Sequence, residues 1–284
     1  IYDVDGNEYL DFVINATSLI LGHSHPGIVE RLKHQASKGT AFSGPVEDLI
    51  NLSEVLCERI PSLDTVRFTN SGTEATLLAI RAARAFTKKN KIAKFEGGYH
   101  GAHESVAISV NPAVNDLTDD IDPVRGYIGQ PEGILNDVVI LPFNDLDVCE
   151  SKLREYKDSL ACVIMEPVIS SFGYTPLDLD FLTGIRNITE ELGILLVFDE
   201  VQSLRISSGG AQQHFGVIPD LTAMGKIIGG GLPVGAFGGR EEIMSLYDQS
   251  EGKAVIPHSG TFNGNPMTLV AGLETMKHLT PDTY

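Results

Sequence analysis

The sequence predicts an α/β fold built on a central, mostly parallel sheet of seven strands. From residue 65 onward, short apolar segments alternate with amphipathic ones, a pattern typical of parallel strands joined by crossover helices. Polar or small residues directly follow five of the apolar segments, and ligands bind beyond the carboxyl ends of parallel strands. With 284 residues, 42% of them hydrophobic, the chain can bury a large core.

The elements follow from local patterns, taken in chain order. Residues 1–12 are expected to form a hairpin around the turn dipeptide Asp5-Gly6. Apolar residues at helical spacing predict a helix over 45–60, and the segments 73–86 and 181–192 show the clearest helical periods. The predicted strands are 65–68, 91–95, 138–141, 161–165, 194–198, 221–224 and 234–237.

Composition and charge exclude several classes of function. The formal net charge is −17 and no block of Lys and Arg occurs, which argues against a nucleic-acid partner. No apolar run approaches the roughly 18 residues of a membrane span, and the first residues do not resemble a signal peptide. Three widely spaced cysteines indicate a reducing compartment. We therefore expect a cytoplasmic protein with no membrane partner.

Two histidine pairs could be considered as metal ligands. These are His23 with His25, and His100 with His103. Neither pair has a third ligand at a suitable spacing, so we expect no metal site. No chemistry is assigned to His100.

Lys226 is the residue around which the predicted site is organised. It stands between the apolar segment 221–224 and the glycines Gly229, Gly230 and Gly231. A lysine at the mouth of an apolar segment is partly desolvated, which lowers its pKa and favours the neutral amine that attacks a carbonyl carbon. Schiff-base chemistry needs such an amine. The glycines would let the backbone approach a flat ligand closely or adopt positive φ.

Two other strand ends carry candidate ligand-binding groups. Ser71, Gly72 and Thr73 open a helix, where they form either a phosphate cradle or a plain N-cap. Asp199 ends a buried strand and needs a cationic partner, which a protonated pyridine nitrogen or a structural salt bridge would provide. Glu200 is expected to face the other way, because side chains alternate along a strand.

Tyr99 has glycines on both sides, in the segment 97–101. This arrangement exposes the ring for stacking on a flat aromatic ligand, although a tyrosine in a glycine-rich turn would have the same sequence. Residues 111–137, rich in Asn, Asp, Gly and Pro, predict a long excursion from the sheet that acts as a lid or a subunit contact.

Six segments occur in the order seen in the class III pyridoxal-phosphate aminotransferases, and the chain resembles this family over essentially its whole length. The segments are Asn70-Ser-Gly-Thr-Glu-Ala75, Phe95-Glu-Gly-Gly-Tyr-His-Gly101, Glu166-Pro167, Asp199-Glu-Val-Gln202, Gly225-Lys226 and Gly260-Thr-Phe-Asn-Gly-Asn-Pro266. Residues 209–212 and 229–239 look most like the glutamate-1-semialdehyde 2,1-aminomutase branch. The resemblance implies a three-layer α/β/α PLP-transferase fold of fold type I.

The resemblance also implies a cofactor, pyridoxal 5'-phosphate, and a role for each matching residue. Lys226 would hold the cofactor as a Schiff base and move the proton, and Asp199 would pair with the pyridine nitrogen. Ser71, Gly72 and Thr73 would bind the phosphate, Tyr99 and Val201 would contact the two faces of the ring, and Gln202 would contact the ring hydroxyl. Glu166 would be an acidic residue that supports the site. Thr261 would reach the phosphate in the neighbouring subunit of a homodimer.

The implied function is an aminotransferase that moves an amino group between an amino acid or amine and a keto acid. An aminomutase, which transfers the group within one molecule, would use the same cofactor residues. The segment 203–210 departs from the usual family sequence, so the substrate stays open. A nicotinamide or P-loop nucleotide binder is disfavoured, because Val234 replaces a required glycine and Ile227 follows Lys226.

The expected domain division has three parts. Residues 1–35 form an N-terminal hairpin segment, 36–275 form the large PLP-binding domain, and 276–284 begin a C-terminal small domain that is not present in this chain. Both terminal segments commonly supply substrate contacts in the family. A non-catalytic or truncated PLP-fold protein is therefore a further alternative.

Overall fold

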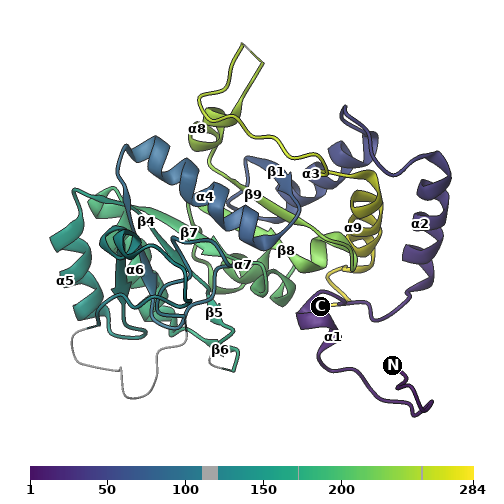
Figure 1. Ribbon diagram of the computed structural model, residues 1–284, viewed down its shortest axis with the longest axis horizontal. Coiled ribbons are helices and arrows are strands. Elements are labelled where there is room, and N and C mark those ends of the chain that lie inside the picture. Colours follow the sequence, from purple (N-terminus) through teal and green to yellow (C-terminus); the bar gives the residue numbers. More distant parts are fainter. Residues whose placement is uncertain (111–120, 172, 251) are drawn as a thin grey trace.

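A seven-stranded sheet forms the centre of the computed structural model, which describes residues 1–110, 121–171, 173–250 and 252–284 (Figure 1). The strand order is β1-β9-β8-β7-β4-β2-β3. β9 pairs antiparallel with both of its neighbours, and the other pairs are parallel. The strands are β1 (Thr65–Thr69), β2 (Lys91–Phe95), β3 (Val138–Leu141), β4 (Leu160–Met165), β7 (Leu195–Asp199), β8 (Leu221–Gly225) and β9 (Gly235–Gly239). The predicted mostly parallel sheet is confirmed, with strand bounds within one or two residues.

Helices cover both faces of this sheet and give it three layers. α4 (Gly72–Thr87) packs on one face, and α5 (Leu146–Tyr156) and α6 (Leu179–Leu192) pack on the other (Figure 1). Because side chains alternate along a strand, Ile164 joins the α4 side and Val163 joins the α5 and α6 side. Strands buried on both faces explain the continuous apolar runs in the sequence.

A third group of helices packs around the β1 and β9 end of the sheet. α3 (Glu47–Arg59) contacts α9 (Pro266–His278), and α2 (Pro26–Lys38) lies along α9. The sequence analysis gave bounds for α3 but not for α2 or α9. Both of these helices have proline at their first position, where its fixed φ suits a helix and its missing N–H costs nothing.

The remaining elements are short. They are α1 (Ile14–Thr17), η2 (Glu132–Asp137), β5 (Val168–Ile169), β6 (Thr175–Pro176), η3 (Ser203–Ile206), α7 (Gly210–Phe215), η4 (Lys226–Gly229), α8 (Glu241–Met244) and η5 (Ser245–Tyr247). The expected N-terminal hairpin is reduced to one antiparallel bridge between Tyr2 and Glu8. The expected excursion lies partly outside the described residues, which leave out 111–120. The domain division stays a prediction, and α9 runs across its boundary at residue 276. None of the described helices is long and apolar enough to cross a membrane.

Candidate functional site

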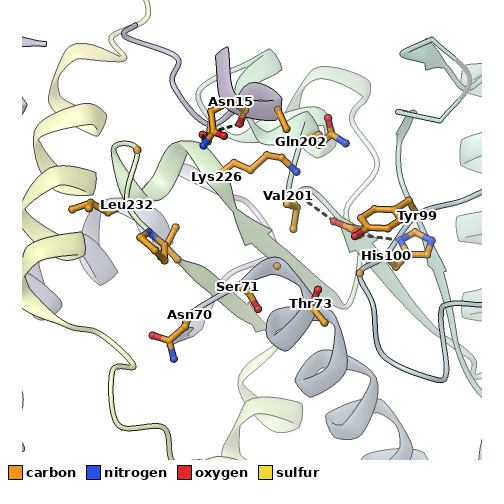
Figure 2. Close-up of a pocket in the computed structure, with 18 of the residues that line it drawn as sticks. Asn15, Asn70, Ser71, Thr73, Tyr99, His100, Val201, Gln202, Lys226 and Leu232 are labelled. Carbon is orange, nitrogen blue, oxygen red and sulfur yellow. Dashed lines mark hydrogen bonds and ion pairs between the residues drawn. The ribbon is translucent and has the colours of Figure 1, made fainter. Parts of the chain in front are cut away.

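A cavity of about 440 Å³ opens at the carboxyl ends of β1, β2, β4, β7 and β8 (Figure 2). Each of the five strand ends singled out in the sequence contributes to its lining. The predicted site residues brought together there are Ser71, Gly72, Thr73, Tyr99, Glu166, Asp199, Val201, Gln202 and Lys226. Thr261 does not line this cavity and is exposed on the loop before α9. Its predicted place is the neighbouring subunit's site, so this prediction stays open.

Lys226 lies half-buried at the end of β8, with its side chain in the cavity (Figure 2). Its φ of 49° is in the left-handed region that a non-glycine residue rarely adopts. No described residue accepts a hydrogen bond from Nζ. Burial lowers the pKa of Lys226, whereas the negative charges of Asp199 and Glu166 oppose the shift. The amine is therefore more readily deprotonated than that of an ordinary surface lysine.

Asp199 is buried and held by two donors. Its Oδ1 accepts from the backbone N–H of Val201 at 3.0 Å, and its Oδ2 lies 2.9 Å from Nδ1 of His100, which is also buried. Asp199 therefore has a partner within the chain in addition to any ligand. The sequence analysis assigned no chemistry to His100, and the structure adds that its side chain contacts the carboxylate at the centre of the site. No basic residue directly follows Asp199 in the sequence. Because a buried carboxylate needs a hydrogen-bonding partner, that partner had to come from another strand end.

Glu166 joins the end of β4 to the end of β2. Its Oε2 accepts from the backbone N–H of Tyr99 at 3.1 Å, and its Oε1 accepts from the Ser170 hydroxyl at 2.6 Å. Burial raises the pKa of Glu166, and His100 opposes that shift. Tyr99 is 43% exposed, so its ring is available to a ligand.

Ser71 is the N-cap of α4, and the cap leaves room for an anion. The Ser71 hydroxyl accepts from the Glu74 N–H at 3.2 Å, and the Glu74 carboxylate accepts from the Asn70 N–H at 2.6 Å. The first N–H groups of a helix have no carbonyl partner within it and point along a positive dipole end. Gly235 of β9 is needed beneath this turn, because a Cβ there would lie 2.0 Å from the Ser71 carbonyl oxygen. The two interpretations of Ser71, Gly72 and Thr73, as a helix N-cap and as a phosphate cradle, are therefore compatible.

The glycines after Lys226 serve mainly to pack the loop. Gly230 and Gly231 have φ of 59° and 94°. An added Cβ would lie 2.4 Å from the Ala271 carbonyl oxygen at Gly230 and 2.7 Å from Leu19 at Gly231. The expectation of positive φ is met at these two positions. At these two glycines the backbone lies close to α9 and to the N-terminal segment.

The N-terminal segment forms a wall of the cavity that the sequence did not predict. Asn15, Ala16 and Ser18 line it, and Figure 2 shows Asn15 on the same side of the cavity as Lys226. All four residues of α1 have φ between 43° and 72°, a strained left-handed turn. Asp11 fixes the start of this turn, since its Oδ1 accepts from the N–H groups of Val13 and Ile14. No apolar period accompanies such a turn, so no sequence pattern predicted it.

Glu200 lies outside the cavity lining, as alternation along β7 predicts. Its carboxylate accepts from the N–H groups of Ala211 and Gln212 at 2.6 and 3.0 Å, at the start of α7. Burial raises the pKa of Glu200, and these hydrogen bonds oppose the shift. Its role is to hold α7 and the loop after β7 together.

The lining of the cavity fits pyridoxal phosphate. It offers a free amine at Lys226, a carboxylate at Asp199 and a helix start at Ser71 for a phosphate. A Cβ at Gly72 would lie 3.0 Å from Val201, so the cradle has no space for a larger residue there. These are the groups that an aldehyde, a pyridine nitrogen and a phosphate each require.

Comparisons with known proteins agree with this geometry. The model of the family described as "Aminotransferase class-III" matches residues 1–284. A glutamate-1-semialdehyde 2,1-aminomutase from Thermodesulfovibrio yellowstonii is 46% identical over 282 residues, which are 99% of this chain and 64% of that protein. The chain thus spans about two thirds of the length of this curated relative.

Solved structures show the same fold. A crystal structure of an omega-transaminase from Sphaerobacter thermophilus is 50% identical with a TM-score of 0.96, and the match covers 99% of this chain and 64% of that one. A transaminase with PLP bound is 40% identical with a TM-score of 0.94, and covers 99% and 65% of the two chains. The predicted resemblance and the PLP-transferase fold are confirmed, and the predicted cofactor is the one bound in the second structure.

Proposed function

The chain belongs to the class-III aminotransferase family, and on that premise we propose that it binds pyridoxal phosphate and transfers an amino group from an amino acid or amine to a keto acid. The observation that carries this proposal is the Lys226 amine, free of any described acceptor, in one cavity with the buried Asp199 carboxylate. The omega-transaminase of 50% identity supports transfer between two molecules.

Each part of the cofactor has residues suited to hold it. The N–H groups and hydroxyls of Ser71, Gly72 and Thr73 would bind the phosphate. Asp199, which contacts Nδ1 of His100, would hold a proton at the pyridine nitrogen. Tyr99 and Val201 would contact the ring faces, Gln202 would contact the ring hydroxyl, and Glu166 would support the site.

The chemistry divides between the cofactor and the chain. When bound, pyridoxal phosphate supplies the aldehyde that carries the amino group and a ring that accepts the electron pair left on the substrate carbon. Lys226 would move a proton at that carbon, because burial lowers its pKa and makes the neutral amine, which can act as a base, more accessible. The turn at Asn15 and Ala16 forms part of the cavity wall beside the reacting groups.

An assay of group transfer tests this proposal. The protein is incubated with pyridoxal phosphate, a panel of amino donors and an added keto acid, and the new amino acid is measured by chromatography. We expect product only when both substrates are present, and none from Lys226→Ala. Lack of transfer for every pair by a protein that has bound the cofactor would reject this activity.

A second candidate, the aminomutase, is favoured by the curated relative of 46% identity. It would use the same cofactor residues and retain the amino group within one molecule. Glutamate-1-semialdehyde supplied without a keto acid distinguishes the two, because only an aminomutase isomerises it in a single turnover cycle. Aminomutase activity without transfer to any added keto acid would replace the first proposal by the second.

We also place the active protein in a homodimer, in the cytoplasm, with small amino and keto compounds as its partners. Thr261 is exposed and does not line its own cavity, which is consistent with a contact to a neighbouring subunit and supports the dimer. Sedimentation of the holoprotein measures the assembly. A monomer that binds the cofactor as tightly as a dimer would contradict the role of Thr261.

A further inference from the structure

Four polar side chains join the loop before α9 to the turn after β1. Arg67 Nε donates to His258 Nδ1 at 3.0 Å, and His258 Nε2 lies 3.0 Å from the Asn263 amide. The Asn263 amide in turn lies 2.7 Å from the amide of Asn70. Asn70 immediately precedes Ser71, and Asn263 follows Thr261 by two residues. The four side chains therefore link the phosphate turn to the loop expected to enter a neighbouring site.

The position of each proton determines which group donates and which accepts along these four side chains. An arginine Nε–H can only donate, so Nδ1 of His258 must accept and the ring proton must sit on Nε2. That Nε2–H needs an acceptor, which is the amide oxygen of Asn263. This requires a half-turn of both asparagine amides, because in the structure the Asn70 nitrogen donates to the Asn263 oxygen and the Asn263 nitrogen faces His258 Nε2. After the exchange of oxygen and nitrogen, the Asn263 nitrogen donates to the Asn70 oxygen, and each of these two contacts joins a donor to an acceptor.

Arg67 and Asn263 are also held by contacts outside this chain of side chains. Arg67 Nη1 donates to the Tyr247 carbonyl at 3.2 Å, and its guanidinium lies 5.7 Å from the centre of the Tyr247 ring. At Asn263, a Cβ on Gly260 would lie 2.5 Å from the side-chain amide, so the loop folds tightly around that side chain. The backbone N–H of Asn263 also donates to the Gly260 carbonyl at 3.0 Å.

We propose that Arg67, His258, Asn263 and Asn70 form a directional hydrogen-bond relay, with His258 neutral and protonated on Nε2, that positions the Ser71 phosphate turn and the Thr261 loop as one unit. This inference rests on the proposed cofactor site and names the residues that shape its phosphate end. His258 and Asn263 are positioning residues, because they act through Asn70 and the loop. The relay makes cofactor affinity depend on the protonation state of His258.

The surroundings of His258 favour its neutral form. Partial burial lowers its pKa, and the charges of Arg67 and Arg81 lower it further, while Glu74 on α4 opposes them. The rings of Phe237 and Tyr247 lie 5.6 and 6.0 Å away, edge to face, and bring no charge at neutral pH. Protonation would put a proton on Nδ1 and remove the acceptor for Arg67 Nε. The relay should therefore break on acidification below the ordinary histidine range.

Two variants and one spectrum test the relay. In His258→Gln the side-chain amide can still accept from Arg67 and donate to Asn263 but cannot be protonated, whereas His258→Leu breaks both contacts. Pyridoxal phosphate affinity is measured by absorbance between pH 5 and 8, with the exposed His34→Gln as the matched control. Nitrogen NMR of histidine-labelled protein, recorded without cofactor, reports the tautomer of His258 directly.

We expect His258→Leu to weaken cofactor binding about tenfold at neutral pH, as for the loss of a positioned polar contact. His258→Gln should retain affinity and lose the acid-side decrease that wild type and His34→Gln share. A His258 spectrum with the proton on Nδ1, or an unchanged pH profile in His258→Gln, would overturn the relay. The NMR spectrum is recorded without cofactor, so it decides the direction of the relay by itself. Failure to bind pyridoxal phosphate would instead reject the proposed function.

Discussion

His100 Nδ1 lies 2.9 Å from Asp199 Oδ2, and both side chains are buried at the carboxyl edge of the sheet. The pair joins the end of β2 to the end of β7 across the intervening β4. A hydrogen bond from the ring N–H stabilises the charged form of a carboxylate, which is the form that can hold a proton on a bound pyridine nitrogen. In the proposed function, His100 would therefore act on the cofactor ring through Asp199.

Removing the His100 donor should slow amino transfer more than it weakens cofactor binding. His100→Leu leaves one oxygen of Asp199 buried without its partner, and we expect kcat to fall about tenfold or more. His100→Asn places an amide N–H near the position of Nδ1 and should recover part of the rate. Steady-state kinetics and the pH dependence of the cofactor absorbance measure both. Equal losses in the two variants would mean that the hydrogen bond is not the cause.

Replacing Glu166 with glutamine should make Lys226 deprotonate at lower pH. The negative charge of Glu166 raises the pKa of Lys226 against the effect of burial, so its removal leaves burial less opposed. The neutral amine, which attacks the aldehyde, forms above that pKa. The pH at half-maximal rate of cofactor attachment should therefore move down. Stopped-flow absorbance from pH 6 to 10 measures it, and Glu132→Gln, on the exposed η2, is the control. An upward shift in Glu166→Gln would contradict the electrostatic account.

Lys94 is a fully buried lysine that should make folding stability depend on pH. Its Nζ donates to the Ile108 carbonyl at 2.6 Å, and burial lowers its pKa to about 7. Between that value and the model-compound value of 10.5, the unfolded chain binds a proton that the folded chain does not. Stability should therefore rise with pH over this window, by up to about 1.4 kcal/mol per unit.

Urea unfolding at several pH values between 7.5 and 9.5 checks this slope. Lys94→Met should flatten it, because the titrating group is gone, and Lys253→Met, at an exposed position, should leave it unchanged. The absolute free energy of unfolding of Lys94→Met depends on two opposing effects, which are the removal of a buried amine and the loss of its hydrogen bond to the Ile108 carbonyl. An unchanged slope in Lys94→Met would show that Lys94 stays protonated in the folded protein.

The sheet could be predicted from the sequence because its strands are buried on both faces. Runs such as that of β7 are continuous and apolar, and the residue after each run marks the edge where ligands bind. This logic placed Lys226 and Asp199 in one cavity. α9 could not be predicted in the same way, since it is buried nearly all round and has no polar face to give a period.

The rest of the site depends on contacts between distant segments, which no local pattern encodes. The left-handed turn at Asn15 is held by Asp11 and by Arg205, whose guanidinium donates to the Thr17 carbonyl from 188 residues away. The His258 relay joins Asn70 to Asn263 across 193 residues. Such pairs become visible only when the sheet order is known, because it brings β1 beside β9 and the loop before α9.

The central claim is that one amine, Lys226, carries the cofactor. The protein is loaded with pyridoxal phosphate, reduced with borohydride, digested and mapped by mass spectrometry, with Lys226→Ala treated in parallel. The account predicts a single modified lysine, at residue 226, and no modified peptide from the variant. A modified lysine elsewhere in the wild-type chain, or a loaded wild type with residue 226 unmodified, would contradict it.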